Sequence, residues 1–253
     1  MRSNSRSFLI EGTTGKYYVA KLADGLNGNR LLVNEFLSTR FLQHIGVATP
    51  TVCLLEVPEV GNPRALCFSE QGEPFHLKPG LHLGSECPLD PRVTAIFDVL
   101  PRSLYGRVRN LTDLAAVFVF DRWASYTGTR STIFFRNEND SDRRFQLNTI
   151  SGAAAFGGRA WQFADDGLKG LVWPTQVYRF LAMKYLCEMA IDRINMPTEQ
   201  DIHEHCAQVP DDWLTESDRH ILLTEVIETL LSRRSQLPSI VWRDLAIIGS
   251  GAA

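Results

Sequence analysis

Strand patterns and helix patterns occupy different parts of this chain, and that division limits the folds it can adopt. In the first 60 residues, short β-branched and aromatic runs at residues 7–11, 16–22 and 51–57 predict three strands. One helix is predicted between the second and third strands, because apolar residues recur at helical spacing up to Ile45 and Gly46 then follows. The order strand, strand, helix, strand indicates a small β-rich unit that carries a single helix.

The second half of the chain is mainly helical. Three apolar patterns predict helices at residues 114–120, 176–191 and 215–232. Residues 110–113 offer capping side chains to the first of these, and Thr215 with Asp218 has capping-box spacing at the start of the last. Between the first two helices, residues 132–135 and 145–150 predict a short hairpin. Residues 58–91 are rich in Gly and Pro, so we expect them to wrap between the two halves without a core of their own.

This layout predicts an α+β, two-lobed protein-kinase-like fold. Its parts are a β-rich N-lobe at residues 1–60, an inter-lobe connection at 61–110 and a helical C-lobe at 111–253. We expect them to form one kinase-like domain.

Charge and composition exclude several classes of protein. The net charge is −3, from 26 basic and 29 acidic residues, which gives no electrostatic reason to expect nucleic acid or an anionic membrane as partner. No apolar run approaches the roughly 20 residues that span a bilayer, and the first residues lack the apolar core of a signal peptide. The five cysteines are scattered and odd in number, which favours reduced thiols and a cytoplasmic location.

Lys21 and Glu35 are the candidate nucleotide-binding pair. Lys21 ends the strand YYVAK, and Glu35 lies in the first turns of the next helix. In a kinase small lobe, a strand lysine contacts the nucleotide phosphates and a helix glutamate holds that lysine in place. The alternative is a solvated strand end and an unrelated surface glutamate.

Several short motifs, in order and at matching spacing, carry a resemblance to a known family. They are YYVAK (17–21), NEFLSTR (34–40), GLHLGS (80–85), VRNL (108–111), FDRW (120–123), AFGG (155–158) and VPDDW (209–213). Over almost its whole length the chain resembles the HipA-like kinases, in particular their short bacterial branch. The resemblance implies an ATP-dependent Ser/Thr kinase fold with ATP and Mg²⁺ between the lobes, and it makes Lys21 and Glu35 the nucleotide-positioning pair.

The sequence departs from the family where the catalytic acid is expected. After FDRW the family has an Asn-x-Asp-Gly-Arg-Gln-like run, which supplies that acid and a metal ligand. Here Tyr126 replaces the Asn, Gly128 the acid and Ser131 the amide-bearing residue, and only Arg130 matches. Gly128 has no side chain with which to orient a nucleophile.

A second departure removes the family's metal-binding aspartate. The family has an Ile-Asp-x-Gly-like run before AFGG, and here Ser151 stands at the place of the Asp. A neutral serine cannot offset the charge of Mg²⁺ as a carboxylate does. The family's Gly-rich loop is also missing its glycines, because residues 3–7, where they are expected, read SNSRS. These losses favour a pseudokinase that acts as a nucleotide-binding or regulatory module, with ATP as the expected ligand and without Mg²⁺.

Two other functions stay open. In the first, the protein is an active phosphotransferase with relocated carboxylates, in which Asp121 acts together with Asp165 or Asp166. Asp121 can equally be structural at the end of its helix, and adjacent acids before a glycine are typical of a solvated turn. In the second, the chain is a non-catalytic structural scaffold that meets a protein partner through apolar surface of its turn-rich middle.

The remaining candidates have weaker patterns. His82, in GLHLGS, either touches the nucleotide or locks the connection between the lobes. His203 and His205 would point about 160° apart on a helix, so we predict no metal site there. Gly157-Gly158 is too short to be a phosphate-binding fingerprint by itself. Arg233-Arg234 is interpreted as a match to the dipole at the end of the last helix.

Overall fold

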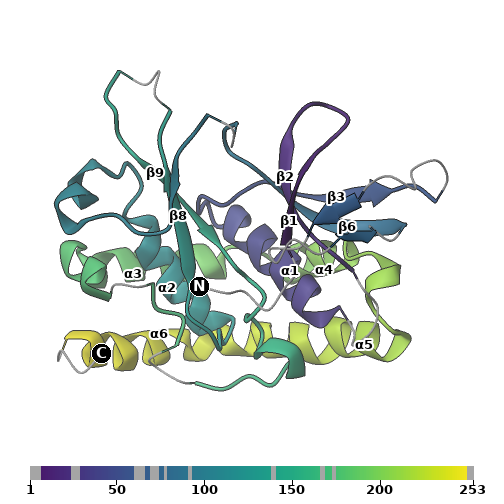
Figure 1. Ribbon diagram of the computed structural model, residues 1–253. Helices are drawn as coiled ribbons and strands as arrows, with labels where there is room; N and C mark the ends of the chain where they lie inside the picture. Colours follow the sequence, from purple (N-terminus) through teal and green to yellow (C-terminus); the bar gives the residue numbers. More distant parts are fainter. Residues whose placement is uncertain are drawn as a thin grey trace.

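The computed structural model describes residues 7–23, 29–59, 66–68, 74–76, 79–90, 93–137, 141–165, 169–172 and 175–249. A small antiparallel sheet with one helix forms one part of the molecule, and helices with a second small sheet form the other (Figure 1).

The small part is a four-stranded antiparallel sheet in the order β1-β2-β6-β3. Its strands are β1 (Ser7–Glu11), β2 (Tyr17–Lys21), β6 (Gly80–Glu86) and β3 (Val52–Val57). The predicted strands at residues 7–11, 16–22 and 51–57 are confirmed to within a residue. The expectation that residues 58–91 only connect the lobes missed β6, which pairs with both β2 and β3.

A short hairpin precedes β6 in the chain. Its strands are β4 (Leu66–Phe68) and β5 (Pro74–His76), which pair antiparallel. The segment predicted to be turn-rich therefore contains three strands. β4 and β5 pair locally with each other, whereas β6 forms because pairing with the distant strands β2 and β3 outweighs the local preference of Gly and Pro for turns.

The one helix of the small part, α1 (Arg30–His44), is buried on nearly every side. It packs against β3, against α4 (Glu199–Ala207) and against the 3₁₀ turn η4 (Asp211–Trp213). A helix covered all round can hold polar residues only where they find partners. Asn34 and Glu35 are such residues, and both are buried.

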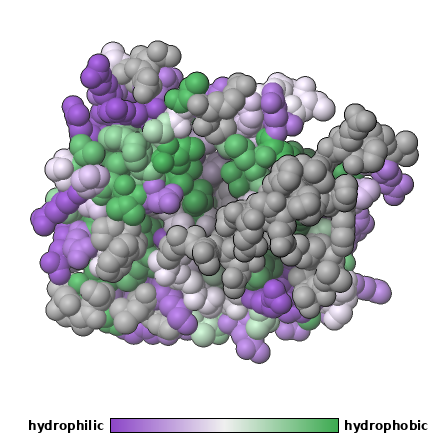
Figure 2. Space-filling view, viewed as in Figure 1, coloured by the Kyte–Doolittle hydropathy of each residue, from purple (hydrophilic) through white to green (hydrophobic). Residues whose placement is uncertain are grey.

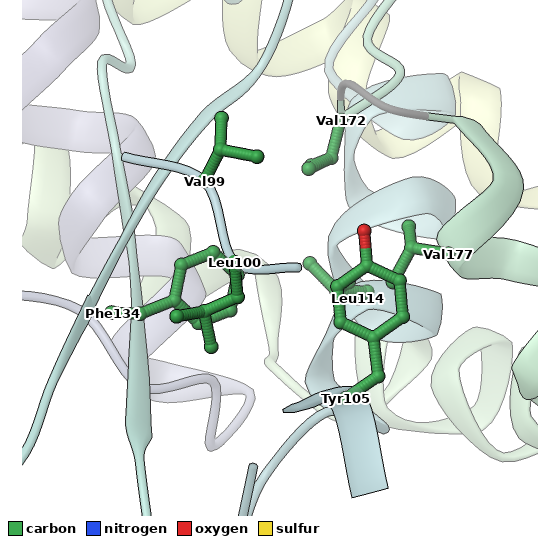
Figure 3. A pocket seen from close by; sticks show the side chains of 7 residues that line it. All are labelled: Val99, Leu100, Tyr105, Leu114, Phe134, Val172 and Val177. Carbon is green, nitrogen blue, oxygen red and sulfur yellow. The ribbon is translucent and has the colours of Figure 1, made fainter. Parts of the chain in front are cut away.

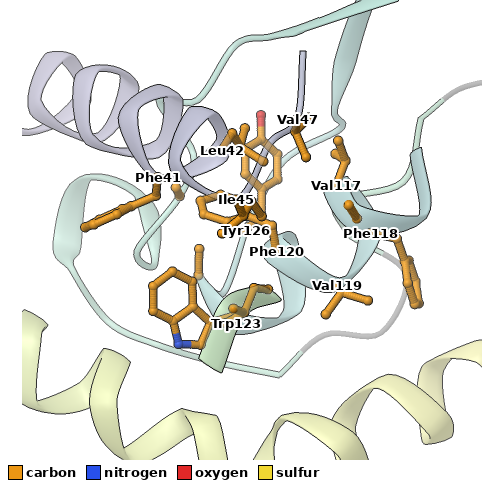
Figure 4. Packing of buried hydrophobic residues seen from close by; sticks show 14 of the residues in the cluster. Phe41, Leu42, Ile45, Val47, Val117, Phe118, Val119, Phe120, Trp123 and Tyr126 are labelled. Carbon is orange, nitrogen blue, oxygen red and sulfur yellow. The ribbon is translucent and has the colours of Figure 1, made fainter. Parts of the chain in front are cut away.

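The core of the larger part surrounds α2 (Asp113–Trp123), whose residues from Leu114 onward are all buried. Figure 4 shows Trp123 beside Phe41 of α1, and their rings meet edge to face at 5.7 Å. The Trp123 indole Nε1 donates to the carbonyl of Leu230, at 2.8 Å. This one side chain therefore joins α1, α2 and the last helix.

The second sheet has the order β7-β8-β9. The hairpin predicted at residues 132–135 and 145–150 is confirmed as β8 (Ser131–Phe135) and β9 (Gln146–Ile150), with Ser131 opposite Ile150. The edge strand β7 (Ile96–Phe97) was not predicted. The 3₁₀ helix η1 (Arg102–Arg107) leads from β7 toward α2. Asn110 does not cap α2 as expected but exchanges hydrogen bonds with the backbone of Leu147 in β9.

The helix predicted at residues 176–191 is broken in two. A 3₁₀ helix, η3 (Thr175–Phe180), precedes α3 (Met183–Asn195). The Tyr178 hydroxyl accepts a hydrogen bond from the backbone N–H of Val172. This contact fixes η3 in a position that a continuous helix from residue 176 to 191 would not give it.

The last predicted helix is longer than expected. It is built from α5 (Glu216–Ile221), a π-helical segment η5 (Leu222–Val226) and α6 (Ile227–Gly249), which runs along the bottom of Figure 1 and contains Pro238. The predicted cap is confirmed, since Thr215 Oγ1 accepts from the N–H of Asp218. Because α6 continues to Gly249, Arg233-Arg234 is not at a helix end and the dipole interpretation was wrong.

The C-terminal helices tie the two parts of the molecule together. Trp213 Nε1 donates to the carbonyl of Leu81 in β6, at 2.8 Å, and the Trp213 ring packs edge to face on Phe36. Arg30, at the start of α1, forms an ion pair with Asp218 at 2.5 Å. The VPDDW motif therefore fixes the small sheet against the larger part.

Two expectations from composition can be compared with the structure. Among the cysteines whose side chains the structure describes, Cys53, Cys87, Cys187 and Cys206 are free thiols. None of the described helices combines the length and apolar character that crossing a membrane requires.

We predict that Trp123→Ala lowers the free energy of unfolding by about 3–5 kcal/mol, because it opens a cavity and removes the indole donor to the Leu230 carbonyl. Urea denaturation followed by far-UV circular dichroism measures this. The control is Tyr185→Ala, whose side chain is 62% exposed and should change stability by less than about 0.5 kcal/mol. Equal losses in the two variants would contradict the central position of Trp123.

Candidate functional site

Lys21 and Glu35 form an ion pair between the sheet and α1. The Lys21 Nζ lies 2.9 Å from Glu35 Oε1, with side-chain exposures of 15% and 6%. Lys21 is the last residue of β2, and Glu35 lies in the second turn of α1. The reading of Glu35 as an unrelated surface residue does not agree with this burial. A buried carboxylate that fixes a partly accessible ammonium leaves that ammonium available to an anion.

The same helix holds the loop of residues 151–158. The second oxygen of Glu35 accepts from the N–H of Ala153 at 3.1 Å. The Asn34 amide donates to the carbonyls of Ala153, Ala155 and Gly158, and Asn34 Oδ1 accepts from Trp161 Nε1 at 2.7 Å. Asn34 was part of a sequence motif, but its role was not predicted. No sequence signal singles it out, because α1 also carries the buried polar residues Glu35, Ser38 and Thr39.

Two glycines allow the loop to approach its neighbours. A Cβ on Gly152 would lie 1.7 Å from the Ser38 hydroxyl on α1, so the loop backbone packs directly on that helix. Gly157 has φ +76°, and a Cβ there would meet the backbone of Gln162 at 2.2 Å. The turn into η2 (Gly158–Ala160) thus requires glycine for backbone reasons.

Arg130 is the centre of the second half of the site. Its guanidinium bonds both carboxylate oxygens of Asp121, with Nε 3.0 Å from Oδ2. Its Nη1 donates to the carbonyls of Ile150 and Ser151, at 3.3 and 3.2 Å. The guanidinium carbon lies 3.9 Å from the centroid of the Tyr126 ring. Arg130 therefore joins the end of α2 to the end of β9.

Tyr126 occupies the space beside Gly128. Its hydroxyl donates to the Ser151 carbonyl at 2.5 Å, and the side chain is buried. Burial raises the pKa of Tyr126 to about 12. A Cβ on Gly128 would lie 3.1 Å from Ala154 Cβ and 3.3 Å from the tyrosine ring. A side chain at position 128 would therefore need its neighbours to move.

The segments around Tyr126 and Ala154 are joined by backbone hydrogen bonds. The N–H of Thr127 donates to Ala154, that of Phe156 to Ala124 and that of Gly157 to Ser125. Four residues of these segments have positive φ although they are not glycine. They are Ser125, Ser151, Phe156 and Trp161. Such strain, about 1–3 kcal/mol per residue, persists only where surrounding contacts fix the backbone.

The carboxylates proposed as substitutes are bound elsewhere. Burial raises the pKa of Asp121, against the attraction of Arg130, and both of its oxygens contact that arginine. Asp165 accepts from Arg233 at 2.6 Å, and Arg233 also donates to the carbonyls of Arg122 and Trp123. Asp166 and residues 3–6 lie outside the described residues.

His82 and the predicted histidine pair lie on different elements, His82 in β6 and His203 and His205 in α4. His82 is buried in β6, and its Nδ1 accepts from the N–H of Ala23 at 3.1 Å, which links β6 to the end of β2. On α4, His203 is partly exposed near Glu199, whereas Cys206 is fully buried. Across the ranges that the structure describes, no group of three or more His, Cys, Asp or Glu could hold a metal.

A small cavity lies in the larger part of the molecule. Its volume is about 10 Å³. Figure 3 shows the side chains around it, among them Phe134 of β8 and Val177 of η3. It is lined by Val99, Leu100, Tyr105, Leu114, Phe134, Val172 and Val177. This volume holds at most one water molecule, and the lining is mostly apolar, so the cavity is a packing gap.

The comparison with solved structures identifies the fold. A crystal structure of a Helicobacter pylori proinflammatory kinase, CtkA, aligns with this chain at a TM-score of 0.56, over 98% of this chain and 94% of that one. This is a two-lobed kinase-like fold. The sequence identity is 13%, so the likeness concerns the fold alone. No family model matches the chain, and no curated protein matches it significantly.

The raised pKa of Tyr126 predicts a pH dependence of stability. The folded protein keeps the phenolic proton up to about pH 12, whereas an unfolded tyrosine loses it near its ordinary value of 10. The free energy of unfolding should therefore fall between pH 10 and 11.5, by up to about 2 kcal/mol from this group. We predict that Tyr126→Phe is less stable at pH 8, by about 1 kcal/mol, but declines less above pH 10.

Urea denaturation at pH 8, 10 and 11.5 tests this. Tyr185→Phe, at an exposed position, should decline in parallel with the unmodified protein. Parallel decline of Tyr126→Phe as well would show that Tyr126 does not carry the effect.

Proposed function

We propose that this chain is a HipA-like kinase-fold protein that binds a nucleotide, with ATP as the expected ligand, through Lys21 and does not perform ordinary phosphotransfer. It would then be a pseudokinase that acts as a nucleotide-binding or regulatory module. The observation that carries the proposal is the ion pair at 2.9 Å between the partly accessible Lys21 and the buried Glu35, next to a loop in which Ser151 stands at the family's metal-binding position.

The residues present fit the phosphate groups of a nucleotide. Lys21 offers a compact positive charge, and Glu35 restricts its position. The residues do not fit Mg²⁺, which needs carboxylate ligands. Gly128 and Ser151 supply none, and the carboxylate of Asp121 is bound by Arg130. Metal-assisted transfer of a phosphoryl group therefore has no evident support in this site.

A regulatory role has a physical route through Glu35. One of its oxygens contacts Lys21, and the other accepts from Ala153 in the loop that Asn34 also holds. A nucleotide that draws Lys21 away would change the charge balance at Glu35. The 151–158 loop would respond through the Ala153 hydrogen bond, so occupancy of the site could be transmitted to that loop.

The alternatives receive less support. An active enzyme with relocated carboxylates needs Asp121, together with Asp165 or Asp166, to reach the substrate. Asp121 would have to leave Arg130, and breaking such a fully buried pair costs about 3–5 kcal/mol. Asp165 would have to leave Arg233. A non-catalytic structural scaffold remains compatible with the fold, and it is distinguished by an absence of nucleotide binding.

We predict that ATP binds with similar affinity in Mg²⁺ and in excess chelator, as measured by titration calorimetry. Loss of Lys21 should weaken binding by about 10- to 100-fold, as expected for a charge-assisted contact. Because Lys21→Ala leaves Glu35 buried without its cation, Lys21→Met/Glu35→Gln is measured beside it, and circular dichroism confirms that both variants fold.

The matched control is Lys16→Ala, which removes a more exposed lysine paired with Glu86 on the same sheet. Its affinity should stay within about twofold of the unmodified protein. Binding that requires Mg²⁺ would favour the enzyme with relocated carboxylates. Absence of binding in both conditions would leave the scaffold and refute the proposal.

We also predict that Ser151→Asp makes ATP binding depend on Mg²⁺. The residue has φ +64°, a conformation that aspartate adopts more readily than most residues. A carboxylate there restores a hard oxygen ligand, so Mg²⁺ should raise ATP affinity at least about fivefold in this variant. Ser151→Asn, of the same size and without charge, should show no such increase. An identical response of the two variants would mean that position 151 does not reach the phosphates.

A further inference from the structure

A pocket lined by arginines lies at the loop end of the β8–β9 hairpin. Its volume is about 200 Å³, and its lining residues are Leu89, Arg109, Phe135, Arg136, Asn137, Arg144 and Gln146. Phe135 pairs with Gln146 at this end of the hairpin, and Ser131 pairs with Ile150 at the end near Arg130. Four residue steps separate the two ends, roughly 13 Å along the strands. The pocket is therefore distinct from the Lys21–Glu35 site.

The described residues that line this pocket carry positive charge only, although the sequence of the hairpin loop also contains Glu138, Asp140 and Asp142. Each charged residue among its described lining residues is an arginine, whereas the chain carries a net charge of −3. Figure 2 shows hydrophilic side chains beside apolar surface at the upper left, where the hairpin end lies in Figure 1. The guanidinium of Arg136 lies 5.4 Å from the centroid of the Phe145 ring, which holds it over the hairpin.

The carboxylate of Asp142 already accepts hydrogen bonds from one of these arginine side chains and from the backbone of another. Asp142 Oδ1 accepts from Arg109 Nη2 at 2.7 Å and from the backbone N–H of Arg144 at 3.1 Å. These donors lower the pKa of Asp142. The arginine and aspartate side chains are 42% and 45% exposed, so the pair is screened by water and contributes little. A ligand with more charge than a carboxylate can therefore replace Asp142 at Arg109.

The lining also limits the size and shape of the ligand. Phe135 and Leu89 provide an apolar wall beside the arginines. Pockets for drug-sized molecules measure about 300–1,000 Å³, so this one suits a single anionic group with a short apolar stem. Arginine forks bind phosphate oxygens two at a time.

We propose that this pocket binds the phosphorylated side chain of a peptide, with an aromatic stem as in phosphotyrosine. The phosphate contacts Arg109, Arg136 and Arg144, and the ring lies against Leu89 and Phe135. The proposal does not depend on nucleotide binding at Lys21.

Titration calorimetry at about 50 mM salt tests this with three probes: inorganic phosphate, phenyl phosphate and N-acetyl-phosphotyrosine amide. Phenyl phosphate should bind at one site, and more tightly than inorganic phosphate, because its ring buries apolar surface. The phosphotyrosine amide should bind at least as tightly as phenyl phosphate. Arg144→Gln should weaken phenyl phosphate binding by about tenfold or more, and Asp142→Asn should strengthen it by removing the competing carboxylate.

The control is Arg143→Gln, which makes the same change of charge at the neighbouring exposed residue outside the pocket lining. It should alter affinity by less than about twofold. Equal effects of Arg143→Gln and Arg144→Gln would overturn the site, because only the general charge would then matter. Equal affinity for inorganic and phenyl phosphate would contradict the contact of the ring with Leu89 and Phe135. If phenyl phosphate binds and the phosphotyrosine amide does not, the ligand is not a phosphorylated peptide.

Discussion

The buried guanidinium of Arg130 fixes the geometry on which the rest of this site depends. It binds Asp121 at the end of α2, the carbonyls of Ile150 and Ser151 at the end of β9, and the face of Tyr126. Without it, the fully buried Asp121 carboxylate would be left without its cation, at a cost of several kcal/mol, and the carbonyls of Ile150 and Ser151 would each lose one donor. Arg130 is also the residue of its run that matches the HipA-like pattern. Its structural role is a reason for an arginine at position 130 that does not depend on a catalytic acid at position 128.

The described carboxylates of the site are bound by neighbouring cations and backbone N–H groups. The carboxylate of Asp121 is bound by Arg130, and that of Asp165 by Arg233. Glu35 divides its two oxygens between Lys21 and the Ala153 N–H. The Lys21 ammonium lies at the end of β2, where Glu35 holds it partly accessible to solvent. This arrangement of charges supports the proposal that the site holds an anion.

Local patterns predicted those parts of the fold that local physics determines. The first three strands, α1, α2 and the β8–β9 hairpin follow from periodicity, with Gly46 after the end of α1, and the cap of α5 by Thr215 follows from spacing. Strand β6 could not be predicted this way, because GLHLGSE has no clear alternation and its two partner strands are separated from it by many residues. The break before α3 depends on the contact of Tyr178 with Val172, which periodicity does not encode.

The contact between Lys21 and Glu35 was expected from the sequence, but the other contacts around this pair were not. The resemblance suggested Lys21 with Glu35, whereas the three carbonyls bound by Asn34 lie about 120 residues further along the chain and no local signal indicates them. The measurement that tests the central claim most directly is a single-turnover incubation of excess protein with γ-labelled ATP and Mg²⁺. The predicted result is that ATP is lost no faster than in a control without protein. Transfer of label to protein, or release of ADP, that is lost in Lys21→Ala would contradict the account.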